Sequence, residues 1–193
     1  MATFFTKEEA RAAGRDAHFY RTASQVLAAS VESVRGDETF DVFLSHSSSD
    51  AELILGVKKL LEQRDLTVYV DWVNDVQLDR TRVTPQTADL LRRRMRQCQT
   101  LIYAATDNAT GSKWMPWELG YFDGLRNQNV AVMPLTDRAS EGFRGQEYLG
   151  LYPVVSRETG QFGVGSVYVD DQGRRRTLLR EFAKGRPSWS TYR

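Results

Sequence analysis

Residues 40–50 read FDVFLSHSSSD, and this stretch decides the fold. Its first part, Phe40 to Ser45, is short and rich in apolar and aromatic residues, which is typical of a strand buried on both faces. A polar turn of serines follows, and an amphipathic helical pattern begins after Asp50. A buried strand that leads through a polar turn into a helix is how a parallel α/β sheet opens.

The same alternation continues along the chain. Strands are predicted at residues 66–70, 100–104 and 130–135, where β-branched and apolar residues dominate. Helices are predicted between them, the last two at residues 87–97 and 114–127. The βαβαβαβ order from residue 40 to residue 135 predicts a parallel sheet with helices on both of its faces.

The two flanks carry weaker signals. Residues 7–34 place small and apolar residues at spacings of three and four, which predicts one N-terminal helix. A fifth strand is predicted at residues 152–155, and residues 164–179 predict a hairpin, although residues 178–184 fit a short helix equally well. We therefore divide the chain into an N-terminal helical extension (1–37), an α/β domain (38–155) and a C-terminal extension (156–193).

Composition limits the partners that can be expected. The 193 residues contain 26 Lys and Arg against 25 Asp and Glu, a formal net charge of +1, so no global field favours nucleic acid or an anionic membrane. The single cysteine, Cys98, excludes an internal disulfide and fits a reducing compartment. There is neither a signal-peptide pattern nor a run of roughly 20 apolar residues. We expect a cytoplasmic protein that binds neither nucleic acid nor a membrane.

Several common kinds of site are missing from the sequence. It contains no G-x-G-x-x-G and no G-x-x-x-x-G-K-[ST], so a Rossmann site or a P-loop of the usual kind is not expected. It has no cysteine pair, and His18 lies far in sequence from His46, which argues against a zinc site. The G-x-S-x-G elbow of a serine hydrolase is also missing. We expect neither a metal nor a bound cofactor.

An unusual segment stands at the start of the predicted helix 114–127, where residues 112–119 read SKWMPWEL. Trp114 and Glu118 are four residues apart, so they lie on one face of a helix, and Trp117 directly precedes the glutamate. A carboxylate beside two indoles is partly removed from water. Such a group could bind ribose hydroxyls and stabilise positive charge at an anomeric carbon, as the cleavage of a glycosidic bond requires.

Both segments match a known family. The opening strand, residues 40–47, resembles that of Toll/interleukin-1 receptor (TIR) domains, and residues 112–119 resemble the S-x-W-x-x-x-E-L helix start of the same family. The loop at residues 72–86 matches the BB loop of TIR domains in position. The resemblance covers roughly residues 38–155. Within the family, the chain is similar in kind to the NAD-processing TIR proteins of bacterial antiphage systems such as Thoeris.

The resemblance implies a fold and an activity. The fold would be a flavodoxin-like parallel sheet of five strands, and the activity would be cleavage of NAD to nicotinamide and ADP-ribose or a cyclic isomer of ADP-ribose. NAD would be the substrate, and no cofactor would be needed. The protein would form a homo-oligomer. A separate downstream effector protein could bind the nucleotide product. Glu118 would be catalytic, and the substrate-binding residues would be Phe43, Ser45, Asp71, Trp72, Ser112, Trp114 and Trp117.

Plainer interpretations stay open beside this one. Glu118 fits an ordinary first-turn glutamate favoured by the helix dipole, and Trp114 and Trp117 fit core residues. Residues 45–49 fit turn and cap chemistry. The chain as a whole also fits a non-catalytic TIR scaffold that assembles through loop 72–86, or a nucleotide-binding regulator without turnover.

Overall fold

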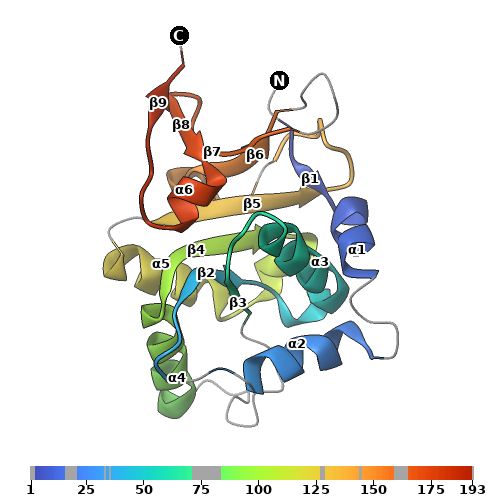
Figure 1. Cartoon of the computed structure of the whole chain (residues 1–193), viewed down its shortest axis with the longest axis vertical. Coiled ribbons are helices and arrows are strands. Elements are labelled where there is room, and N and C mark those ends of the chain that lie inside the picture. Colours follow the sequence, from blue (N-terminus) through green and yellow to red (C-terminus); the bar gives the residue numbers. More distant parts are fainter. Residues whose placement is uncertain are drawn as a thin grey trace.

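Parallel strands run through the centre of the protein, with helices packed against them (Figure 1). The structure is a computed structural model that describes residues 3–15, 21–32, 34, 36–70, 84–126, 129–143, 145–158 and 165–192. The predicted loop at residues 72–86 falls outside these ranges except for its last three residues.

The central sheet has the strand order expected of a flavodoxin-like fold. Its strands are β3 (Val68–Val70), β2 (Phe40–Ser45), β4 (Cys98–Ala105), β5 (Val130–Thr136) and β6 (Val154–Arg157), in that spatial order. All four pairings between them are parallel. In the chain β2 comes before β3 and β4, but in the sheet it lies between them. The direction of winding therefore reverses between β2 and β4. The prediction of a five-stranded parallel sheet is confirmed.

Helices cover both faces of this sheet because alternate residues of each strand point to opposite sides. Val42 and Leu44 of β2 join the core cluster that contains α3 (Ala51–Glu62), whereas Phe43 joins the cluster that contains α4 (Pro85–Arg96) and α5 (Met115–Leu125). Short 3-10 helices follow the carboxyl ends of β2 and β4, namely η1 (Ser48–Asp50) and η2 (Asp107–Gly111), and a third, η3 (Glu147–Leu151), precedes β6.

The prediction of one helix over residues 7–34 is wrong. The chain instead forms a short strand β1 (Phe5–Thr6), a helix α1 (Lys7–Arg15) and a second helix α2 (Ala23–Glu32). A new helix begins at Ala23 because Thr22 and Gln25 form a capping box, in which the Gln25 backbone N–H donates to Thr22 Oγ1 and Gln25 Oε1 accepts from the Thr22 N–H.

The C-terminal segment contains both of the alternatives that its sequence allowed. The hairpin is formed by β7 (Val167–Asp171) and β8 (Arg175–Leu178), and the short helix α6 (Leu179–Ala183) follows directly. A last strand, β9 (Ser190–Thr191), pairs with β8. The antiparallel strands β7 to β9 extend the parallel sheet beyond β6, so residues past 156 continue the same sheet.

The N-terminal segment is fastened to the carboxyl end of β5. Phe5 pairs in parallel with Leu135, and the Arg157 guanidinium donates two hydrogen bonds to the Glu9 carboxylate at 2.6 and 2.9 Å. Burial alone would raise the pKa of the Glu9 carboxyl, but hydrogen bonds from Arg157 and Thr6 outweigh it and lower this pKa. The strand β1 is thereby held beside the end of the sheet where parallel α/β folds bind ligands.

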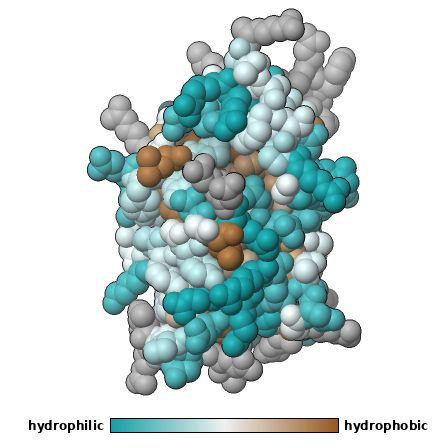
Figure 2. Space-filling view, turned by 90° about the vertical axis from the view of Figure 1, so that its left-hand side faces the viewer, coloured by the Kyte–Doolittle hydropathy of each residue, from teal (hydrophilic) through white to brown (hydrophobic). Residues whose placement is uncertain are grey.

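The outer surface carries little contiguous apolar area on the side that lies to the left in Figure 1. Figure 2 shows this side as mainly hydrophilic, with small separate hydrophobic spots. In the part of the chain that the structure describes, no helix combines the length and the apolar character needed to cross a membrane.

The contact between α1 and α3 depends on a glycine. A Cβ atom added at Gly56 would lie 1.7 Å from the Ala10 carbonyl oxygen, so the two backbones touch. We expect Gly56→Ala to destabilise the protein by about 1–3 kcal/mol, because the helices must separate to admit the methyl group. Urea unfolding followed by circular dichroism measures this loss.

Gly124→Ala is the matched control. Gly124 lies in α5, and nothing would lie within 4 Å of its added Cβ. This exchange should leave the stability unchanged or raise it, since alanine has the higher helix propensity. Equal effects of the two substitutions would contradict the tight α1–α3 contact.

Candidate functional site

Glu118 is a completely buried carboxylate in the first turn of α5. Its side chain has no exposed surface, and the Ser45 hydroxyl donates a hydrogen bond of 2.6 Å to Glu118 Oε2. Ser45 is the last residue of β2, so this hydrogen bond joins the end of a central strand to the start of a helix. It holds the carboxylate in one orientation, which an ordinary solvent-facing glutamate of a first helical turn does not have.

The local sequence explains why α5 begins where it does. Pro116 lies in the first turn, where a missing N–H costs nothing. The Met115 backbone N–H donates to Ser112 Oγ at 3.2 Å, which satisfies one of the free donors of the helix start. Ser112 thus has a structural task at this helix start, whether or not it also contacts a substrate.

The two tryptophans of the segment have different surroundings. Trp114 is 7% exposed, and its backbone carbonyl accepts from the Glu118 N–H at 2.8 Å. Trp117 meets the Trp114 ring edge-on and stacks on Tyr121 at 5.6 Å, while the Arg92 guanidinium lies 5.4 Å from its ring centroid. Trp114 and Glu118 are thus one backbone-bonded turn apart, and Trp117 belongs to a partly buried stack along α5.

Phe43 is a core residue on the face of the sheet that α5 covers. It is two residues before Ser45 in β2, so both side chains are on the α5 face of the sheet. The ring is completely buried and packs against Tyr69 of β3, with 5.6 Å between the ring centroids. These contacts are those of a core residue, and a role of Phe43 as the floor of the site stays a prediction.

A cavity of about 500 Å³ opens where the winding of the sheet reverses, between the ends of β2 and β4. This is where flavodoxin-like folds bind ligands, and the volume lies in the range of small-molecule sites. We call it the switch-point cavity; its described lining residues are Ser47, Ser48, Ser49, Asp107, Asn108, Thr110, Gly111, Ser112, Lys113 and Trp114.

A buried aspartate joins the two walls of the switch-point cavity. Asp50 is 6% exposed and follows the serine loop after β2. Its carboxylate accepts hydrogen bonds from Thr106 Oγ1 at 2.5 Å and Asn108 Nδ2 at 2.6 Å, both in the loop after β4. These two bonds fix the distance between the loops and so fix the width of the cavity.

Tyr103 was missed by the sequence analysis. It is paired in register with Ser45, and burial raises the pKa of its phenol, with the Tyr148 hydroxyl and the Glu118 carboxylate raising it further. The phenol therefore lies close enough to Glu118 to respond to its charge. The signal was present in the sequence, because Tyr103 precedes the end of a predicted strand and ligands bind at such ends.

Two predicted site residues cannot be placed. Asp71 and Trp72 lie outside the described residues, so their contribution to the site stays a prediction. Within the ranges that the structure describes, no group of three or more His, Cys, Asp or Glu side chains is arranged to hold a metal ion.

Comparison with known proteins relates the chain to named enzymes. It is 46% identical over 140 residues to the "Probable 3' cyclic ADP-D-ribose synthase ThsB'" of Bacillus cereus (strain MSX-D12), and the match covers 72% of each chain. It is 32% identical over 107 residues to the "Putative cyclic ADP-D-ribose synthase TIR2" of Cytobacillus dafuensis, covering 55% of this chain and 28% of that protein. No family model matches the chain.

The role of Asp50 can be tested directly. Removing its carboxylate by Asp50→Ala leaves the donors of Thr106 and Asn108 without their partner, so we expect a loss of about 1–3 kcal/mol in the free energy of unfolding. Denaturant titration measures it. Ser48→Ala, at an exposed position of the same loop, should change the stability by less than about 0.5 kcal/mol. A loss as small for Asp50→Ala would contradict the proposed connection.

Proposed function

Since the chain belongs to the bacterial TIR proteins of the Thoeris type, whose relatives are named cyclic ADP-D-ribose synthases, we propose that it is an NAD-consuming enzyme. It cleaves the bond between nicotinamide and ribose in NAD and forms a cyclic isomer of ADP-ribose, or ADP-ribose itself. NAD is consumed as the substrate, and the proposal includes no separate cofactor.

The arrangement of Glu118 carries this proposal. A buried carboxylate, oriented by Ser45 at 2.6 Å, lies in a first helical turn one turn after Trp114, which lines the switch-point cavity. A ligand in this cavity would meet an indole and serine hydroxyls at its walls, and the buried Glu118 carboxylate belongs to the residue one helical turn after that indole. A cationic nicotinamide riboside group matches these features, because an aromatic ring stacks on an indole and a cation is attracted to a carboxylate.

The reaction needs a negative charge close to the anomeric carbon. As the C–N bond breaks, nicotinamide leaves as a neutral molecule with the bonding electron pair, and positive charge develops on the ribose. Glu118 would stabilise that charge, and the hydrogen bond from Ser45 would keep the carboxylate in place while it does so. A hydroxyl oxygen then attacks the carbon and releases a proton. Water gives ADP-ribose, and a hydroxyl group of the same molecule gives a cyclic product.

The burial of Glu118 indicates that this protomer needs a rearrangement to turn over. A carboxylate without exposed surface cannot touch a substrate until the residues that cover it move. We propose that self-association of the chain produces the open form, so that the active species is a homo-oligomer. This would keep NAD consumption low in the resting state.

The biological setting follows from the same proposal. A cyclic ADP-ribose isomer is a diffusible signal, and a separate effector protein would read it during antiphage defence. NAD is available in the cytoplasm, where we place the protein. Neither a nucleic acid nor a membrane is among the proposed partners.

Exchange of the carboxylate tests the catalytic proposal. We expect Glu118→Gln to lower the rate of nicotinamide release from NAD by about 100-fold or more, because the amide keeps the shape but cannot stabilise the ribosyl cation. Ser45→Ala should cost about tenfold in kcat, since the carboxylate loses the bond that orients it. Chromatographic measurement of nicotinamide gives both rates.

Glu52→Gln is the matched control, because Glu52 is also a first-turn glutamate but is exposed, on α3. It should leave the rate unchanged. If Glu118→Gln released nicotinamide at the wild-type rate, the chain would be better described as a TIR scaffold that acts by self-association.

Self-association has its own test. If only the oligomer is active, the specific activity depends on protein concentration, and a tenfold dilution below the association midpoint lowers it by up to about tenfold. Nicotinamide release measured over a dilution series, with the oligomeric state followed by light scattering, gives both curves. A specific activity that stays constant while the oligomer dissociates would show that one protomer suffices.

A further inference from the structure

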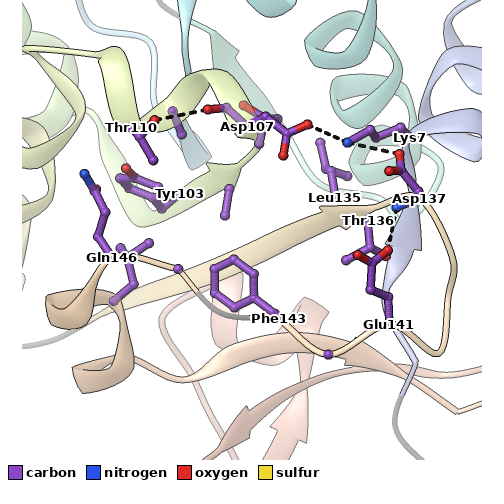
Figure 3. Close-up of a pocket in the computed structure, with 16 residues that line it drawn as sticks. Lys7, Tyr103, Asp107, Thr110, Leu135, Thr136, Asp137, Glu141, Phe143 and Gln146 are labelled. Atoms are coloured by element: carbon purple, nitrogen blue, oxygen red, sulfur yellow. Dashed lines mark hydrogen bonds and ion pairs between the residues drawn. The ribbon is translucent and has the colours of Figure 1, made fainter.

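A second cavity, of about 490 Å³, lies on the other side of η2 (Figure 3). It opens beyond the carboxyl ends of β4 and β5 and is closed on the outside by the loop that contains Phe143. We call it the Phe143 cavity. It shares Asp107 and Thr110 with the switch-point cavity, so η2 is the wall between the two.

The Phe143 cavity reaches the neighbourhood of Glu118. Tyr103 is one of its lining residues, pairs in register with Ser45, and lies close enough to Glu118 for the carboxylate charge to raise the pKa of the phenol, although burial is the larger cause. Trp114 of the switch-point cavity is the other neighbour of Glu118. A folded dinucleotide with one end in each cavity would therefore have both of its ends near residues that adjoin the carboxylate.

The lining of the Phe143 cavity suits a nucleoside. In Figure 3 the Phe143 ring stands in the middle, with Tyr103 and Gln146 on one side and Lys7, Asp137 and Glu141 on the other. Phe143 is half-buried against the core, and the part of an aromatic face that borders a cavity can stack on a nucleobase, while a side-chain amide such as that of Gln146 pairs with the edge of a base. Carboxylates are the usual partners of ribose hydroxyls in dinucleotide sites.

The charge of the cavity excludes a phosphate as its main ligand. Three carboxylates, those of Asp107, Asp137 and Glu141, line it together with one ammonium group. Lys7 already donates to Asp107 at 2.7 Å and lies 3.0 Å from Asp137, so its charge is neutralised by these two. A pyrophosphate would be repelled, whereas an uncharged base with its ribose would not.

We propose that the Phe143 cavity is the adenosine subsite of this enzyme and that it selects cyclisation over hydrolysis. The inference rests on the proposed function. Cyclisation through a ribose hydroxyl of the adenosine half brings that hydroxyl to the anomeric carbon of the other half, so both ends of the molecule must lie near one carboxylate. Two cavities on either side of η2, both adjoining residues next to Glu118, provide this arrangement.

The step balances without any further reactant. The bond from the anomeric carbon to the nicotinamide nitrogen breaks, and its electron pair leaves with nicotinamide. A new bond forms from a ribose hydroxyl oxygen to the same carbon, and the hydroxyl proton passes to solvent. Water competes for the same carbon, and a hydroxyl group held in position wins this competition through its high effective concentration.

The ratio of cyclic to linear product tests the proposal. Because the ratio compares two fates of the same intermediate, it does not change merely because less protein is folded. We expect Phe143→Ala to lower the ratio by about tenfold, since the base loses its stacking partner and the ribose hydroxyl its position. Mass spectrometry of the products measures the ratio. An unchanged ratio would overturn the proposal.

Two further variants make this comparison specific. Gly145→Ala keeps the ring but moves it, because the added Cβ would lie 2.6 Å from Phe143 Cζ, and it should also lower the ratio. Tyr168→Ala removes an aromatic ring from β7, where it contacts Arg176 and not the cavity, and should leave the ratio unchanged. An equal fall for Tyr168→Ala would assign the effect to general loosening and overturn the subsite.

A binding measurement separates this inference from the proposed function. Calorimetric titration of the Glu118→Gln protein with adenosine should show binding that is lost when Phe143→Ala is added. If adenosine binding depends on Phe143 in this way but the wild-type protein releases no nicotinamide from NAD, the subsite is supported and the proposed enzymatic activity is rejected. Adenosine that binds equally well without Phe143, or does not bind at all, would overturn the subsite even if NAD is cleaved.

Discussion

The hydrogen bond between Ser45 Oγ and Glu118 Oε2 is the interaction on which the arrangement of the site depends. A carboxylate that is completely removed from water is costly unless its oxygens are bonded, so Glu118 can be buried only where a donor is already in place. That donor is the last residue of β2, and its position is set by the pairing of β2 with β3 and β4. The sheet therefore determines where the carboxylate lies, and α5 carries Glu118 in its first turn.

The loops around this hydrogen bond are held by polar contacts, one set buried and the other at the surface. Asp50 ties the loop after β2 to the loop after β4, and Lys7 ties η2 to the end of β5. Lys7 belongs to α1, whose packing on α3 requires the bare backbone of Gly56. The N-terminal segment thus contacts the wall between the two cavities through Lys7.

Sequence patterns predicted the parts of this structure that are local. The strands at 100–104 and 130–135 appear within β4 and β5, because both apolar runs are short and contain β-branched residues, which favours a strand over a helix. The helix break near Thr22 was overlooked, although its capping box could have been read from the residue types. The partner of Glu118 could not have been read in this way, because Ser45 is 73 residues away and only the strand order brings the two together. Tyr103 reaches the site for the same reason.

The position of η2 explains how one carboxylate could serve two outcomes. A glycosidic cleavage that needs only a stabilised cation can be followed by attack from any oxygen nearby, so the product depends on what the surrounding walls hold in place. The switch-point cavity has serine hydroxyls and an indole, whereas the Phe143 cavity has an aromatic ring, an amide and carboxylates. Both end at neighbours of Glu118, and both use Asp107 as a wall. Under this proposal the Glu118 carboxylate would allow the bond to break, and the side chains of Phe143 and Gln146 would decide which oxygen replaces nicotinamide.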